Sequence, residues 1–139
     1  MSNSLDRFLI AQENSYDTAL REIRAGKKRS HWMWYIFPQI AGLGMSYTAQ
    51  LYSIRDLEEA REYISEPTLG RRLIEISRAL TALDCSDPTA VMGYPDDLKL
   101  RSCMTLFECV SDDPVFGAVL DKFYGGKRDE RTLSLLGLT

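Results

Sequence analysis

The sequence predicts an all-α fold, in which about six to eight helices pack into a single compact domain spanning residues 1–139. The strongest indication is a stretch beginning at Pro67, whose apolar residues recur at alternating spacings of four and three. These residues are Leu69, Leu73, Ile76, Leu80 and Leu83. A chain of 139 residues with 45% apolar and 27% charged residues also has the composition of an ordinary globular protein, so one hydrophobic core is expected.

The N-terminal part of the chain contains two predicted helices followed by an ambiguous segment. Residues 5–11 can form a short helix capped by Asn3 or Ser4, and Ser15 is expected to cap a second helix that ends at Gly26. The next segment, SHWMWYIFPQ, is apolar without a clear period. A helix and a buried strand are therefore both compatible with it.

The rest of the chain indicates further helices separated by turn residues. Asp56 and Asp129 are expected to cap helix starts, while Gly125 marks a helix stop. The expected helical ranges are 46–54, 57–64, 67–83, 95–110, 114–124 and 129–136, with a turn or short helix over 87–93.

Charge and composition argue against several classes of protein. A formal charge of −3 disfavours a generic nucleic-acid binder, which needs a basic face, although it does not rule out nucleic acid as a partner. The longest apolar stretch, residues 32–37, is far shorter than the roughly 20 residues that cross a bilayer, and no leader pattern opens the chain. We therefore expect a soluble cytoplasmic protein with no membrane partner.

No cofactor or metal site is indicated by the motifs. The three cysteines, Cys85, Cys103 and Cys109, form no C-x-x-C pair, which favours a reducing compartment and gives no thiolate zinc site. Neither G-x-G-x-x-G nor G-x-x-x-x-G-K-[ST] occurs, so the corresponding nucleotide-binding folds are disfavoured. The aspartates near predicted helix starts are interpreted as caps, although a magnesium ion carried by a bound phosphate remains compatible with them.

The candidate site centres on the SHWMWYIFPQ segment. His31 is the only histidine, so any imidazole acid or base must be this residue. Trp32 and Trp34 offer flat surfaces for stacking on a base or sugar, and Gln39 offers both a donor and an acceptor. Arg29 closes a run of five cations in nine residues that could hold a phosphate.

Each of these features also has a structural interpretation. The aromatic residues can be core residues, with His31 a surface or hydrogen-bonded structural residue, because buried aromatics usually contribute packing energy. The basic run can equally be a solvated helix end and loop. The sequence leaves both interpretations open.

A second group of candidates lies on the helix expected over residues 95–110. Lys99 and Ser102 fall along one edge of its apolar face, where polar groups can line a pocket. Lys99 and Cys103 are helical neighbours, so the ammonium could favour a thiolate. Cys103 lies within the apolar face, however, which favours a small core residue over a nucleophile.

Taken as a whole, the chain resembles a bacterial family known only as domain of unknown function 1810, members of which are sometimes labelled calpastatin. The resemblance rests on LDRF-x-x-AQ, KKRSHWMWYIFPQIAGLG, EAREYISEPTLGRRL, DDLKLRSCMTLF and GGKRDERTL, which together cover nearly the whole chain. It implies packed, roughly orthogonal helices and no established activity. Cys103 departs from the serine common at that position in the family, and the globular composition does not fit the disordered inhibitor calpastatin.

We therefore expect one pocket that binds an anionic, nucleotide- or sugar-phosphate-like small molecule. Its expected lining is His31, Trp32, Trp34, Gln39, Lys99 and Ser102, with Arg29 beside it. If a reaction occurs there, His31 is the candidate general acid or base and Lys99 the candidate electrostatic stabiliser. The alternative is a non-enzymatic module that binds a protein or single-stranded nucleic acid. The sequence leaves open the ligand, the oligomeric state and whether any reaction is catalysed.

Overall fold

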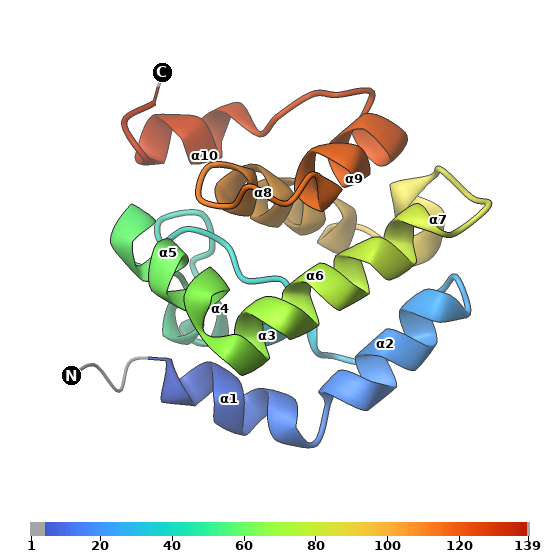
Figure 1. The fold of residues 1–139 in the computed structure, drawn as a ribbon, viewed down its shortest axis with the longest axis horizontal. Coiled ribbons are helices and arrows are strands. Elements are labelled where there is room, and N and C mark those ends of the chain that lie inside the picture. Colours follow the sequence, from blue (N-terminus) through green and yellow to red (C-terminus); the bar gives the residue numbers. More distant parts are fainter. Residues whose placement is uncertain (1–4, 139) are drawn as a thin grey trace.

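The computed structural model describes residues 5–138, which form helices and no strand (Figure 1). The helices are α1 (Asp6–Glu13), α2 (Tyr16–Arg24), α3 (Met33–Ile36), α4 (Tyr47–Leu51), α5 (Leu57–Ser65), α6 (Pro67–Thr81), α7 (Pro88–Met92), α8 (Asp96–Glu108), α9 (Val115–Tyr124) and α10 (Glu130–Leu135). The all-α prediction is confirmed. None of these helices is long and apolar enough to cross a membrane.

The predicted number of helices was too low, because the described residues contain ten. The difference lies in short elements. The ambiguous aromatic segment forms the single-turn helix α3, which buries Met33 and Ile36. The expected helix over 46–54 ends earlier, at Leu51, because Ile54 leaves the helix to form an isolated bridge with Ile40.

Side-chain caps explain where several helices begin. Asp56 Oδ1 accepts a hydrogen bond from the Glu59 backbone N–H at 2.9 Å, and Asp129 Oδ2 accepts one from the Thr132 N–H at 3.1 Å, as predicted. Ser15 does not cap α2, because its hydroxyl accepts a hydrogen bond from Tyr35 Oη instead. The proposed caps Asn3 and Ser4 lie outside the described residues.

The core is one continuous cluster of buried side chains, with α8 at its centre. Figure 1 shows α8 between the C-terminal helices α9 and α10 on one side and the N-terminal half of the chain on the other. The apolar stripe predicted on α6 is buried at Leu69, Leu73, Ile76 and Leu80, while Leu83 is partly buried beyond the end of the helix. Cys103 is fully buried in α8, which agrees with its interpretation as a core residue.

The close approach of α5 and α6 depends on Gly70. A Cβ atom at this position would lie 2.1 Å from the carbonyl oxygen of Ile64, a backbone atom that cannot move without shifting α5. We expect Gly70→Ala to lower the free energy of unfolding by about 1–3 kcal/mol, measured by urea denaturation.

A matched control is Gly117→Ala in α9. Its Cβ would meet the end of the Glu108 side chain at 2.8 Å, a group that can move, and alanine favours a helix by about 1 kcal/mol over glycine. An equal loss of stability in both variants would contradict the role assigned to Gly70.

Candidate functional site

The basic segment before the aromatic residues is organised by one carboxylate, Glu22 on α2. Its oxygens accept hydrogen bonds from the backbone N–H groups of Arg29 (2.8 Å) and Ser30 (3.0 Å), from Ser30 Oγ (2.5 Å) and from the Trp32 indole N–H (2.9 Å). Burial alone would raise the pKa of this carboxyl, but hydrogen bonds to the charged form outweigh burial and lower the pKa to about 2. Glu22 is therefore ionised at neutral pH and holds the segment in place.

Lys28 ties the same segment to α8. Its Nζ lies 3.0 Å from Asp96 Oδ2 and 5.1 Å from the centre of the Trp32 ring, and its backbone N–H donates to the Val91 carbonyl at 2.7 Å. The positive charge of Lys28 is thus compensated within the structure. It is a packing residue of this region rather than a free anion-binding group.

The aromatic segment and α8 meet at Trp34. Lys99 Nζ lies 5.5 Å from the centre of the Trp34 ring and 3.5 Å from Asp96 Oδ1. These distances fit a cation–π contact and an ion pair within one helical turn. The pocket hypothesis requires the two segments to come together, and they do so at this point.

The other predicted site residues are placed differently. Trp32 is 1% exposed, so no face of its ring is free to stack on a ligand. His31 and Arg29 are exposed, and His31 lines a small hollow of about 170 Å³ with Asn14 and Ser15 on the far side of the segment. The Gln39 carbonyl accepts a hydrogen bond from the Ile54 N–H at 2.8 Å, which positions the bridge between residues 40 and 54. His31 and Lys99 line no common hollow among those found over residues 5–138.

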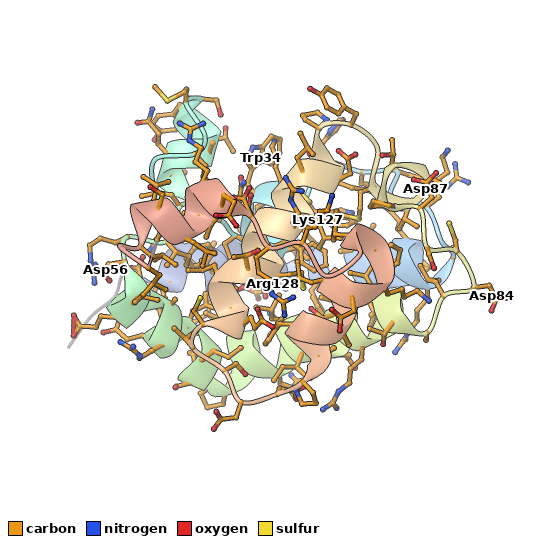
Figure 2. All side chains as sticks on the ribbon, turned by 90° about the horizontal axis from the view of Figure 1, so that it is seen from above. Trp34, Asp56, Asp84, Asp87, Lys127 and Arg128 are labelled. Carbon is orange, nitrogen blue, oxygen red and sulfur yellow. The ribbon has the colours of Figure 1, made fainter. Side chains whose placement is uncertain are left out.

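A larger hollow lies between α8 and the segment that follows α9, and Ser102 contacts Asp129 at its edge. The Ser102 hydroxyl lies within donating distance of two acceptors, the Leu98 carbonyl oxygen (3.2 Å) and Asp129 Oδ2 (3.0 Å). The hollow beside this contact has a volume of about 630 Å³. We call it the cationic hollow; its lining residues are Arg101, Gly126, Lys127, Arg128, Asp129, Glu130, Arg131 and Leu133. Figure 2 looks onto this region and shows Lys127 and Arg128 above α8, with Trp34 on the same side of the molecule.

The cations of this hollow differ in how far they are compensated. Arg128 forms a two-pronged pair with Glu108, whose Oε1 lies 2.8 Å from Arg128 Nε. Arg101 stacks over the Tyr124 ring at 5.9 Å and reaches Asp129 only at 3.8 Å. The Nε atom of Arg101 is buried and has no hydrogen-bond partner in the described part of the chain. Lys127 is exposed and makes no ion pair with residues 5–138.

Sequence reasoning missed this hollow, although one signal was present. The tail GGKRDERTL contains three cations within five residues, at Lys127, Arg128 and Arg131. Arg101 lies on a different helix, and only the folded chain brings it to the tail.

The buried thiol of Cys103 is not a candidate nucleophile, and the described residues contain no cluster of metal ligands. Burial raises the pKa of the Cys103 thiol well above its ordinary value, so it stays protonated at neutral pH. Among residues 5–138, no group of three or more His, Cys, Asp or Glu side chains could hold a metal ion.

Comparison with known proteins gives one family and one solved structure. The family model described as "Protein of unknown function (DUF1810)" matches residues 2–136. A crystal structure of the conserved hypothetical protein Rv1873 from Mycobacterium tuberculosis superposes with a TM-score of 0.94 at 46% identity, and covers 97% of each chain. No curated protein matches the chain.

We expect Glu22→Gln to destabilise the protein by about 1–2 kcal/mol at pH 7, because it weakens hydrogen bonds to a charged acceptor. The pKa of Glu22 is lowered from 4.5 to about 2, so its contribution is present above pH 4.5 and is lost as the pH falls toward 2. Urea denaturation from pH 7 to pH 2 should therefore show the wild-type and Glu22→Gln curves converging at low pH.

The matched control for this variant is Glu13→Gln, because Glu13 is exposed at the end of α1. It should change stability by less than about 0.5 kcal/mol at any pH. A constant difference between wild type and Glu22→Gln at all pH values would contradict the role of the charge.

Proposed function

The chain belongs to the DUF1810 family of proteins of unknown function, and we propose that it binds an anionic, nucleotide- or sugar-phosphate-like small molecule in the cationic hollow. The main support is Arg101, which lines the hollow with a partly exposed side chain and reaches Asp129, its ion-pair partner among the described residues, only at 3.8 Å. A guanidinium with so weak a partner can still donate charge-assisted hydrogen bonds to the oxygens of a phosphate.

The size and charge of the hollow fit such a ligand. Its volume of about 630 Å³ lies within the range of small-molecule sites. Four cationic side chains and two carboxylates, Asp129 and Glu130, line it. Arg128 is already paired with Glu108, whereas Arg101, Lys127 and Arg131 retain most of their capacity to bind an anion.

The surface around Trp34 and Lys99, which we call the aromatic site, would bind the base or sugar of a nucleotide-like ligand. Trp34 is partly exposed and has Lys99 against its ring at 5.5 Å. Lys99 lies three residues before Ser102, whose hydroxyl bonds Asp129 at the edge of the hollow. In this proposal a base or sugar stacks near Trp34, and its phosphate extends past Ser102 into the cationic hollow.

Catalytic roles for His31 and Lys99 are a separate part of the proposal. Both residues stay candidates because His31 is the only imidazole in the chain and Lys99 adjoins the aromatic site. His31 lines a different hollow from the cationic one. Binding in the cationic hollow therefore does not require His31, whereas turnover by imidazole chemistry would.

A thermal-shift screen against nucleotides, ADP-ribose-like compounds and sugar phosphates tests this proposal. A ligand at a hundredfold its Kd should stabilise the protein by about 2.7 kcal/mol. We expect Arg101→Gln to weaken binding of that compound by about tenfold, because a charge-assisted hydrogen bond is lost. Arg61→Gln is the matched control, since Arg61 is exposed on α5 and does not line the cationic hollow.

The same screen includes His31→Ala and Lys99→Ala. A reduced shift in Lys99→Ala with an unchanged shift in His31→Ala would support binding near Trp34. An equal shift in wild type and Arg101→Gln, or no shift with any compound, would contradict a ligand in the cationic hollow.

The second candidate function is binding of single-stranded nucleic acid. It is favoured by two large side chains that are exposed near Lys99. Tyr94 is 77% exposed and Leu98 is 45% exposed at the start of α8, next to Lys99. Aromatic rings that stack on bases, together with cations that contact phosphates, are typical of such proteins.

Salt dependence separates the two functions. If an oligonucleotide binds, we expect its affinity to fall steeply with salt, by a slope of about −0.7 for each phosphate contacted. Tyr94→Ala should then weaken binding while leaving stability unchanged, because the side chain is exposed. Binding of a small anion alone, with a shallow slope and no effect of Tyr94→Ala, would exclude this second function.

A further inference from the structure

A second hollow lies on another part of the molecule, and we propose that it binds a small amphiphilic acid, with a terminal carboxylate and an apolar body. It is formed by α2, α6 and the segment that precedes α9, and its volume is about 700 Å³. We call it the arginine hollow; its lining residues are Arg24, Arg71, Ile74, Glu75, Arg78, Ala79, Ala82, Leu83 and Asp113. None of them lines the cationic hollow.

Helix geometry places the arginines around a common space. Arg71 and Arg78 are seven residues apart on α6, which puts them on the same face, two turns from each other. Ile74 lies between them on that face. Arg24 in the last turn of α2 approaches from the opposite wall. A ligand in the hollow would therefore meet guanidinium groups from two helices.

The carboxylates of the hollow leave part of this positive charge uncompensated. Asp113 Oδ2 pairs with the Arg78 guanidinium at 2.9 Å. Glu75 Oε1 accepts a hydrogen bond from Tyr16 Oη at 2.6 Å, which directs this carboxylate toward α2. Arg24 and Arg71 make no ion pair with any of residues 5–138. Two guanidinium groups are thus free to bind one incoming carboxylate.

Apolar side chains form a large part of this hollow. Ile74, Ala79, Ala82 and Leu83 supply four of its nine lining residues. A phosphate alone would leave this apolar surface in water. An alkyl or aromatic body attached to the carboxylate would cover it, which contributes roughly 25 cal/mol per Å² of apolar surface buried.

Isothermal titration calorimetry with decanoate, below its critical micelle concentration, tests this site on the full chain. We expect one decanoate to bind per protein, and Arg71→Gln to weaken binding by about tenfold. Ala82→Trp should abolish binding by filling the hollow; Ala82 is exposed at the end of α6, so the fold should tolerate the larger side chain. Arg61→Gln should leave decanoate binding unchanged, because Arg61 lines neither hollow.

Two further probes separate the head group from the tail. Decyltrimethylammonium has the same tail with the opposite charge, and inorganic phosphate has an anionic head without a tail. Neither should bind in the arginine hollow. The proposal is wrong if decanoate does not bind, if it binds equally to wild type, Arg71→Gln and Ala82→Trp, or if the cationic amphiphile binds as tightly as decanoate.

Discussion

The burial of α8 is the constraint on which the rest of the structure depends. From Leu100 to Phe107, every residue of α8 is buried except Arg101. The guanidinium of Arg101 therefore lies at the edge of the core, while the neighbouring side chains pack inside the core. Because a charged head group is costly to bury, it must reach water, a partner or a ligand. Tyr124 and Asp129 meet the guanidinium only in part, at 5.9 Å and 3.8 Å. The candidate site is thus a consequence of packing a helix whose residues 100–107 are buried on almost every side.

Glu22 on α2 holds the basic segment that precedes the aromatic residues in place. In the sequence, the run of cations before the aromatic segment is a candidate anion site. In the structure, the carboxylate of Glu22 accepts hydrogen bonds from the backbone N–H groups of Arg29 and Ser30. Asp96 forms an ion pair with Lys28. What distinguishes the C-terminal cations is the space that they share. Arg101, Lys127, Arg128 and Arg131 line one hollow of about 630 Å³, whereas Arg29 lines none of the hollows found over residues 5–138.

The fold could be predicted from the sequence more completely than the site. The stripe from Leu69 to Leu80 and the cap at Asp56 depend on local spacing, which the sequence displays directly. Trp32 could not be assigned to core or site, because its burial depends on whether a distant carboxylate reaches its indole N–H. The cationic hollow was missed for a similar reason: Arg101 meets the tail around Arg128 only through the packing of α8 against α10.

A net charge of −3 is compatible with two anion sites on one small domain. At physiological ionic strength the Debye length is about 8 Å, so exposed charges on the far side of the molecule have little effect on a bound anion. Local pairing then decides affinity. In the cationic hollow the decisive group is the Arg101 guanidinium, which is only partly exposed, so its attraction for an anion is screened less than that of an exposed lysine. In the arginine hollow the cations are exposed and more strongly screened, and burial of an apolar body must supply the larger part of the binding free energy.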